Sequence, residues 1–479
     1  MYKNKIIKLL QQASGEKDVS LDIPTNSSFG DYSTNVAMVL GKKKGINPEK
    51  LAKKIVGKLN ENKESKILFA DIKIEGPGFI NLYLKDDVLV DSLKQISKEK
   101  NKFGSSDFGS GKLVVVDYSA PNIAKPFGIG HLRSTVIGQA IYNLFAFSGY
   151  RVIGDNHLGD WGTQFGKLLY MIDKNGGITD SVDKDFDIEK LEKLYVQFHV
   201  LEAEDSSLSG LARAWFKKLE NGDKKARDIW QKCVDVSMAE FDSIYKLLEV
   251  KLDYAYGESF YQDLMDKMLQ SNSLLKHIST GEDGKSKIIN LEKFVINTPL
   301  MFLKSDGATT YATRDLATIK FRMQKWNPEI IVYEVGAEQT LHFRQLFAAA
   351  KLIGLVNDDV KLIHTGHGLY LAPDGKKFST RKGSTVKLEE VLNEAIIKAK
   401  ELGSTDGKTA QMVGIGAIKY FDLSHGVSSN VVFDWKKVLN MEGNSGPYIQ
   451  YSVARTNSVI KKAKDEKQKP QKEVIMEKE

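Results

Sequence analysis

The side chains that could do chemistry gather first in one segment, residues 114–138, which reads VVVDYSAPNIAKPFGIGHLRSTVIG. An apolar run gives way to glycines and then to an amphipathic pattern, which predicts a strand, a turn and the start of a helix. Unpaired N–H groups and the helix dipole favour an anion at such a start. Gly130 lets the backbone approach that anion closely, and Lys125 and His131 can reach towards it. The segment therefore predicts a phosphate site, although such a turn can also be purely structural.

A second cationic segment, residues 374–388, reads DGKKFSTRKGSTVKL and lies between a predicted strand and a predicted helix. Four basic residues occur within seven positions, with small residues among them. By itself this pattern is typical of a solvated surface loop. Together with the first segment, it predicts two cationic segments that bind the phosphates of one nucleotide from opposite sides. Neither segment completes a P-loop or a dinucleotide fingerprint.

The elements that must position these segments alternate between strands and helices along the chain. This order predicts an α/β fold with a doubly wound, Rossmann-like parallel sheet, in which ligands bind beyond the carboxyl ends of the strands. Strands are expected at residues 112–119, 150–157, 329–336 and 361–368, and helices at residues 131–149 and 340–354.

Three domains are expected. Residues 1–98 combine helical patterns with a strand-like segment and predict a small α+β domain, which a polar, glycine-rich linker follows. Residues 110–400 form the doubly wound domain, and charged amphipathic helices at about 175–295 predict an insertion into it. Residues 401–479 predict a helical segment, and every pattern from residue 387 onward is helical.

Composition restricts the class of protein. A hydrophobic content of 42% and a charged content of 27% are ordinary for a globular protein. The one cysteine, Cys233, excludes an intramolecular disulfide, fits a reducing compartment and suits a packing role in a helix. The N-terminus lacks the pattern of a signal peptide, and no apolar run is long enough to span a membrane. We therefore expect a cytoplasmic protein without membrane contact.

Charge is unevenly distributed. The net charge is +7, and residues 1–100 contribute +5 of it, with lysines and no arginine. A basic segment of this kind is either a binding surface for a polyanion or a solvated lysine-rich face. Charge alone thus makes nucleic acid a plausible partner and no more.

The motifs together resemble the class I aminoacyl-tRNA synthetases, and within them the arginyl-tRNA synthetase family. Gly128-Ile129-Gly130-His131 is similar to the first class signature, and Lys377-Phe378-Ser379-Thr380-Arg381 to the second. More specific to the family, and in its order, are SAPNIAKPFGIGHLRST, NHLGDWGTQFG, TYATRDLA, GAEQTLHFRQLFAAAK and GPYIQYSVAR. FGDYSTNVAM and GPGFINLYL resemble its additional N-terminal domain, so the resemblance spans nearly the whole chain.

The resemblance implies an arginine–tRNA ligase, which activates L-arginine with ATP and transfers it to the 3′ end of tRNA(Arg). ATP is then a substrate, and Mg²⁺ is expected on its phosphates, with no acidic cluster assigned to hold the metal. The residues implied to bind ATP are Gly128, Gly130, His131, Gly368, Lys377 and Ser379, and those implied to neutralise developing charge are Lys125, His131, Lys377 and Arg381.

Two positions depart from the family's pattern. Gly128 stands where the family usually has a histidine near the ATP phosphates, which leaves His131 as the remaining imidazole of the motif. Thr380 stands where many class I enzymes have the second lysine of the late loop. In the arginyl family, the lysine upstream of the first turn is thought to substitute for that lysine. The resemblance therefore implies this role for Lys125.

Selection of arginine implies acceptors for a planar guanidinium with five donors. By the resemblance, Asp117 and Asp315 face the guanidinium and Tyr311 closes the pocket, while Asn122 and Gln339 hold the α-amino end. Asp117 is one methylene shorter than the glutamate common at its position. From the residues alone, Asp315 could instead cap a helix and Tyr311 could be a core residue. A site of this kind rejects ligands that leave acceptors unpaired, which fits the absence of a large separate editing domain.

Two other functions compete with the ligase: a non-catalytic tRNA-binding relative with a degenerate ATP site, and a nucleotidylyltransferase that uses the same two cationic segments without tRNA. The C-terminal region starts like the family's anticodon-binding helical domain, with 32 residues after Pro447. Residues 461–479 contain seven lysines, five acidic residues and no aromatic residue, so we expect them to fray. We therefore expect a C-terminally truncated, monomeric enzyme, residues 1–98 being an additional tRNA-binding domain, which binds ATP and arginine but charges tRNA poorly.

Overall fold

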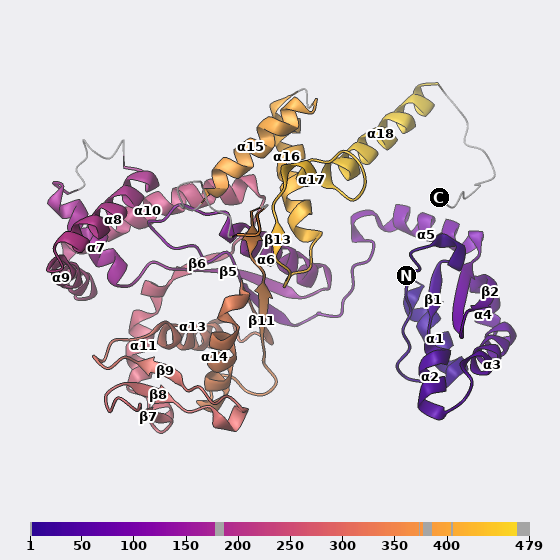
Figure 1. Ribbon diagram of the computed structural model, residues 1–479, viewed down its shortest axis with the longest axis horizontal. Helices are drawn as coiled ribbons and strands as arrows, with labels where there is room; N and C mark the ends of the chain where they lie inside the picture. Colours follow the sequence, from indigo (N-terminus) through magenta and orange to yellow (C-terminus); the bar gives the residue numbers. More distant parts are fainter. Residues whose placement is uncertain (1, 178–185, 373, 377–385, 404–405, 467–479) are drawn as a thin grey trace. The chain divides into compact units, whose positions relative to one another are not determined.

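The computed structural model describes residues 2–177, 186–372, 374–376, 386–403 and 406–466 (Figure 1). The chain divides into two compact units, one built on Met1–Ser105 and one on Ser106–Lys462. Within the described ranges, no helix is long and apolar enough to cross a membrane.

The first unit is a small α+β structure. Its antiparallel sheet has the strand order β1-β3-β2, and its core is closed by apolar helix faces such as that of Ala52, Ile55 and Leu59. The helix that carries this face starts sharply because Asn47 accepts hydrogen bonds from two backbone N–H groups and Pro48 takes the first helical position. Its elements are α1 (Lys3–Ser14), η1 (Ser27–Phe29), β1 (Tyr32–Thr34), α2 (Val36–Lys44), α3 (Pro48–Glu61), α4 (Lys63–Leu68), β2 (Phe69–Glu75), β3 (Phe79–Leu84), α5 (Asp86–Glu99) and η2 (Lys100–Lys102).

The second unit contains the parallel sheet predicted from the sequence. Five strands run in the order β11-β10-β4-β5-β6, and each pair of neighbours is parallel. This confirms the doubly wound α/β class. The strands are β4 (Leu113–Asp117), β5 (Arg151–Leu158), β6 (Tyr254–Gly257), β10 (Ile330–Gly336) and β11 (Lys361–His367).

Strand β4 lies at the centre of the sheet and is buried on both faces, which explains its unbroken apolar sequence. Val114 and Val116 pack towards α6 (Gly130–Phe147) on one face. Val115 packs on the other face with residues of α13 (Tyr311–Trp326) and α14 (Thr340–Leu352). Helix α6 approaches the sheet closely because Gly138 has no side chain, since a Cβ there would lie 2.2 Å from Cβ of Tyr118.

The range predicted as a helical insertion, 175–295, is not helical throughout. It also contains β6, which is the edge strand of the main sheet, and two strands of a separate antiparallel sheet in the order β7-β8-β9. Besides β6, the elements from residue 163 to residue 303 are α7 (Thr163–Lys174), α8 (Ile188–Glu204), α9 (Leu208–Glu220), α10 (Lys224–Leu247), η4 (Glu258–Tyr261), α11 (Gln262–Leu269), α12 (Asn272–Leu275), β7 (Ile278–Thr280), β8 (Lys287–Ile289), η5 (Glu292–Phe294) and β9 (Leu300–Leu303).

The C-terminal part of the second unit is mostly helical. One exception to the all-helical prediction is β13 (Val431–Val432), which pairs in parallel with β12 (Tyr370–Leu371). The helices are α15 (Leu388–Glu401), α16 (Gly407–Leu423), α17 (Trp435–Val438) and α18 (Gly446–Asp465). Gly446 and Pro447 of α18 are buried, whereas Tyr448 and Tyr451 are exposed.

Candidate active site

A cavity of about 700 Å³ opens where β4, β10 and β11 end and α6 begins. This is the place expected for a ligand in an open parallel sheet. Six of the residues predicted for the site line it: Asn122, Gly128, Gly130, His131, Gln339 and Gly368. The structure thus brings together residues that lie up to 246 positions apart, from Asn122 to Gly368.

The turn before α6 is held by the segment that leads into α15. Ile129 N donates to Val386 O at 2.9 Å, and Leu388 N donates to Phe127 O at 2.7 Å. Gly128 forms a bridge with Lys387 between these two bonds. The late segment therefore does meet the first one, although Lys377, Ser379, Thr380 and Arg381 themselves lie outside the described residues.

His131 lies in the first turn of α6 with its Nδ1 3.2 Å from the carbonyl oxygen of Gly128. Burial lowers the pKa of His131 below its ordinary value, against the raising effect of this hydrogen bond. The free site therefore favours a neutral ring whose Nδ1–H donates to Gly128 O. An anion in the cavity would favour the protonated ring instead.

Lys125 is exposed and is not among the residues that line the cavity. Its ammonium lies 5.6 Å from the ring centroid of Tyr195, which belongs to α8. A cation–π contact of this kind is weak at an exposed site, so a stronger anionic partner can displace it. The role predicted for Lys125 on the phosphates stays a prediction.

The loop between β4 and α6 has an unusual backbone. Ser119, Ala120 and Ala124 adopt positive φ angles of 74°, 44° and 62°, a region that costs free energy for residues other than glycine. Each is tied by its backbone N–H to a side chain distant in the sequence: Ser134 Oγ at 3.0 Å, Asn156 Oδ1 at 3.0 Å and Ser237 Oγ at 2.9 Å. These bonds hold the loop that presents Asn122 to the cavity.

Asp117, predicted to face a guanidinium, already binds one inside the protein. Its Oδ2 accepts from Nη2 of Arg322 at 2.7 Å, and Asp155 Oδ2 accepts from Nε of the same residue at 2.9 Å. Burial alone would lower the pKa of Arg322, but the carboxylates of Asp117 and Asp155 raise it well above its ordinary value. Oδ1 of each aspartate is buried and finds no hydrogen-bond partner among the described residues.

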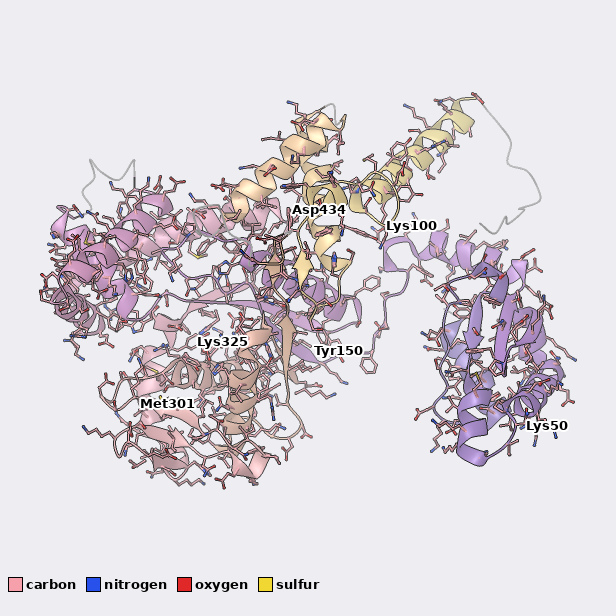
Figure 2. The ribbon with its side chains drawn as sticks, viewed as in Figure 1. Lys50, Lys100, Tyr150, Met301, Lys325 and Asp434 are labelled. Atoms are coloured by element: carbon pink, nitrogen blue, oxygen red, sulfur yellow. The ribbon has the colours of Figure 1, made fainter. Side chains whose placement is uncertain are left out.

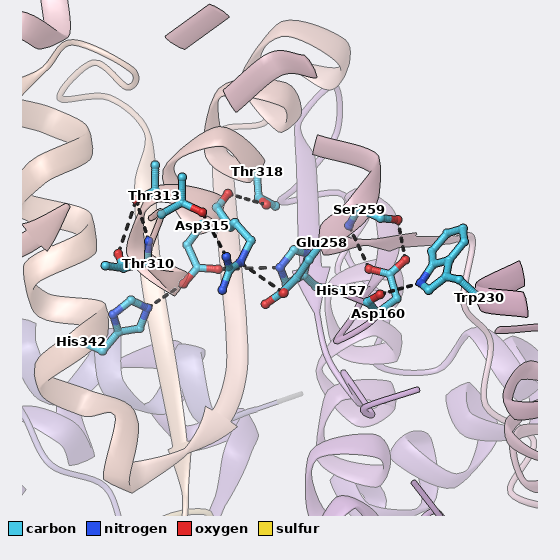
Figure 3. A network of polar contacts seen from close by, with 12 residues as sticks. His157, Asp160, Trp230, Glu258, Ser259, Thr310, Thr313, Asp315, Thr318 and His342 are labelled. Carbon is cyan, nitrogen blue, oxygen red and sulfur yellow. Dashed lines mark hydrogen bonds and ion pairs between the residues drawn. The ribbon is translucent and has the colours of Figure 1, made fainter. Parts of the chain in front are cut away.

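Asp315 lies in the second turn of α13, between two imidazoles (Figure 3). Its Oδ2 is 2.7 Å from Nε2 of His342, and its Oδ1 is 3.7 Å from Nε2 of His157. The cap of α13 is Thr310, which forms a capping box with Thr313. Asp315 is therefore not a capping carboxylate.

Tyr311 begins α13 and is 57% exposed, which excludes a role as a plain core residue. Its ring packs edge-on against His342 with centroids 4.6 Å apart, so it borders the Asp315 group. Arg314, the residue before Asp315, has its Nε 3.1 Å from Glu258 Oε2, and burial raises the pKa of Glu258 (Figure 3).

Six of the predicted residues thus line the cavity, Tyr311 and Asp315 form a second group around His342, and Asp117 pairs with Arg322. Asp117, Tyr311 and Asp315 are not among the residues that line the cavity. The two groups meet through one short segment, because Gln339 of η6 (Ala337–Gln339) lines the cavity while His342, three residues later in α14, binds Asp315.

Sequence reasoning missed several buried polar residues around these groups. Arg322, His342 and Asp155 hold the predicted carboxylates or sit beside them, and Glu334 and His367 line the cavity. The available signal was a charged residue inside an apolar strand or helix face, as with Glu334 in EIIVYEVG. A buried charge in such a run needs a partner, but the run does not say which.

Comparison with known proteins decides the family. A profile described as "tRNA synthetases class I (R), catalytic domain" matches residues 92–435, and one described as "Arginyl tRNA synthetase N terminal domain" matches residues 1–84. The chain belongs to the arginyl-tRNA synthetase family. The family membership confirms the resemblance seen in the sequence motifs.

Curated relatives and solved structures agree with this family. The "Arginine--tRNA ligase" of Chloroflexus aggregans is 39% identical over 459 residues, which are 93% of this chain and 76% of that protein. That of Clostridium botulinum (strain Loch Maree) is 40% identical over 96% of this chain and 82% of that protein. The structure of arginyl-tRNA synthetase from Plasmodium falciparum is 29% identical, with a TM-score of 0.76 over 96% of this chain and 80% of that chain. The Thermus thermophilus enzyme, at 21% identity and a TM-score of 0.78, shares the fold.

Proposed function

We propose that this synthetase-family chain activates L-arginine with ATP and transfers the arginyl group to the 3′ end of tRNA(Arg). In the first step a carboxylate oxygen of arginine attacks the α-phosphorus of ATP, and the bond to the β-phosphate oxygen breaks to release pyrophosphate. In the second step a terminal hydroxyl of the tRNA attacks the arginyl carbonyl and AMP leaves. Positioning and charge stabilisation dominate such chemistry.

The observation that carries the proposal is the junction of two unlike sites. A cavity at a helix N-terminus suits a nucleotide, and the carboxylates of Asp117 and the half-buried Asp315 suit a guanidinium. Gln339 belongs to the first and His342 to the second, one helical turn apart. A ligand with a guanidinium at one end and a carboxylate at the other fits that arrangement.

For the arginine end, we assign Asp117 and Asp315 to the guanidinium, Tyr311 to the closing face, and Asn122 and Gln339 to the α-amino end. The unpartnered Oδ1 atom of Asp117 supports this assignment, because a buried acceptor without a donor costs free energy that a ligand donor would recover. Asp315 is partly exposed and can exchange a histidine contact for the substrate.

For the ATP end, Gly128 and Gly130 let the nucleotide approach the backbone, and His131 meets its phosphates. Gly368 lines the cavity with its backbone, and the Ser429 backbone occupies the place of its missing side chain. The family resemblance adds Lys125, Lys377, Ser379 and Arg381 as further phosphate contacts. Among the described residues, no group of three or more acidic, histidine or cysteine side chains could hold a metal. Mg²⁺ would therefore be carried mainly by the phosphates, whose charge it neutralises.

We propose tRNA(Arg) as the macromolecular partner, and a monomer in the cytoplasm as the working form. The first unit offers exposed lysines, such as Lys50 on α3 (Figure 2), for salt-sensitive phosphate contacts. The second profile match, to an arginyl-tRNA synthetase N-terminal domain, supports a role for this unit in the same enzyme.

Exchange of labelled pyrophosphate into ATP, with and without tRNA(Arg), tests the proposal. We expect exchange that requires arginine and is strongly stimulated by tRNA. Binding of tRNA without exchange would instead identify a non-catalytic relative. Exchange that depends on another acid substrate and needs no tRNA would identify a different nucleotidylyltransferase.

A further inference from the structure

Two ionisable residues that the mechanism does not use form a pair in the cavity wall. Glu334 lies in β10 and His367 is the last residue of the neighbouring strand β11, and both line the cavity. His367 Nδ1 is 3.0 Å from Glu334 Oε1. Glu334 has no exposed surface, whereas His367 keeps 7% exposure.

This pair fixes the direction of the His367 ring. The Glu334 carboxylate accepts from Nδ1–H, so Nε2 is the polar atom left for another partner. Because Nδ1 is held by Glu334, Nε2 is the nitrogen that His367 can present to the cavity it lines. The pair therefore presents one oriented nitrogen to whatever occupies the cavity.

Stability does not account for the pair. Glu334 is enclosed in the central sheet, where burial raises its pKa and the hydrogen bond from His367 opposes that effect. Its Oε2 atom has no hydrogen-bond partner among the described residues. Buried ion pairs are commonly no more stable than apolar residues of similar volume. Because the pair lies in the wall of a binding cavity, contact with a ligand explains it better than stabilisation of the fold does.

The charge of the pair indicates which part of the ligand it meets. The carboxylate of Glu334 offsets any positive charge on the ring beside it, so the pair offers little attraction to a polyphosphate. The groups that attract phosphates are instead the backbone N–H groups at the N-terminus of α6 and the ring of His131. The uncharged nucleoside part is left for the wall formed by the ends of β10 and β11.

We propose that His367, oriented by Glu334, hydrogen-bonds through Nε2 to the nucleoside part of bound ATP. His367 is then a binding residue, and Glu334 is a positioning residue that acts through it. This inference rests on the proposed function only in that ATP is the nucleotide. It adds two residues that the sequence motifs did not indicate.

Calorimetric titration of the full chain tests this assignment without any need for turnover. The ligands are Mg²⁺-ATP and inorganic tripolyphosphate with Mg²⁺, which carries the phosphates without the nucleoside. We expect His367→Ala to weaken ATP binding at least about tenfold and to leave tripolyphosphate binding within about twofold. Glu334→Leu should weaken ATP binding similarly, whereas Glu334→Gln, which keeps an acceptor for Nδ1–H, should retain most of it.

His364→Ala is the matched control. His364 lies on the same strand, but its Nε2 is 3.0 Å from the Val335 carbonyl oxygen and its ring stacks on Phe343, and it is not a cavity residue. Its ATP affinity should match that of the wild type. The double variant Glu334→Leu/His367→Phe replaces the pair by apolar side chains and should fold, yet bind ATP as weakly as His367→Ala.

Analogues then identify the atom that Nε2 meets. If wild type and His367→Ala bind purine riboside triphosphate with equal affinity, the contact is to the adenine amino group. If they bind 2′-deoxy-ATP or 3′-deoxy-ATP with equal affinity, the contact is to the ribose hydroxyl that the analogue lacks. Unchanged ATP affinity in His367→Ala, or an equal loss for tripolyphosphate, would overturn the inference while leaving the proposed function intact. Absence of ATP binding by the wild type would overturn both.

Discussion

Arg322 donates from Nη2 to Asp117 Oδ2 over 2.7 Å, so an internal guanidinium binds one oxygen of a carboxylate that we propose to bind the substrate's guanidinium with the other. The internal arginine also binds Asp155. It therefore holds one oxygen of the buried Asp117 carboxylate and fixes the direction of Oδ1. The arrangement prepares an acceptor for a second planar cation.

The first prediction concerns this buried cluster. Arg322→Met leaves Asp117 and Asp155 without their cation, and we expect the free energy of unfolding to fall by about 3–5 kcal/mol. Urea unfolding followed by tryptophan fluorescence reports on the second structural unit, Ser106–Lys462, because the five tryptophans all lie between residues 161 and 435. Arg151→Met, at the exposed start of β5, is the control and should change stability by less than about 0.5 kcal/mol. Similar losses in the two variants would contradict a buried ion-pair role.

The second prediction concerns selection of arginine. Asp315→Asn replaces a charged acceptor by a group with one acceptor oxygen and two donors that would face donors of the substrate. We expect KM for arginine to rise at least about tenfold and KM for ATP to change far less, measured by pyrophosphate exchange with tRNA present. Asp263→Asn, an exposed position on α11, controls for loss of a negative charge. If both KM values rise equally in Asp315→Asn, the residue does not face the guanidinium.

The main sheet could be predicted from sequence because the local signals of its strands and helices agree with the final structure. Val114, Val115 and Val116 form a continuous apolar run, as a parallel strand buried on both faces requires, and the predicted helices follow in order. The helical prediction for 175–295 was incomplete at Tyr254–Gly257, a strand too short for its pattern to stand out among amphipathic helices. Its place at the sheet edge depends on tertiary pairing with β5.

The candidate site was predictable only where motifs carried it. Asn122, Gly130, His131 and Gln339 line one cavity, and the roles that the resemblance implies for them stay predictions. The supporting pairs do not follow from sequence, since Arg322 meets Asp117 across 205 positions and either residue could have had another partner. Similarly, Glu334 and His367 each look like an isolated anomaly in sequence. The register of β10 and β11 pairs Glu334 with Thr365, so His367 follows two residues later on the same face and within reach of the carboxylate.

The third prediction concerns the turn before α6. We expect Lys125→Ala and His131→Ala each to lower the single-turnover rate of adenylate formation at least about a hundredfold, since each removes a group that neutralises developing charge. Gly128→His should keep or raise the rate, because it restores a group that the family usually has. Lys174→Ala is a matched control, as that lysine also lies over a tyrosine ring, 5.8 Å from the centroid of Tyr170. Rates within a fewfold of wild type for both alanine variants would refute these roles.

The last prediction concerns the proton on His131. Burial, together with the nearby charges of His367 and Lys125, lowers the pKa of this ring in the free enzyme. Phosphates beside the ring would raise that pKa, because an anion favours the charged form. ATP binding should therefore take up a proton, and affinity should fall as the pH rises through the pKa of the bound state.

Titration of ATP near pH 7, in two buffers with different ionisation enthalpies, measures this uptake directly. We expect the apparent binding enthalpy to differ between the buffers for the wild type and to differ less for His131→Asn, which cannot change its charge. Adenosine, which lacks phosphates, should show no such difference with either protein. The same buffer dependence in His131→Asn as in the wild type would show that another group takes up the proton, and would remove the evidence for a phosphate contact at His131.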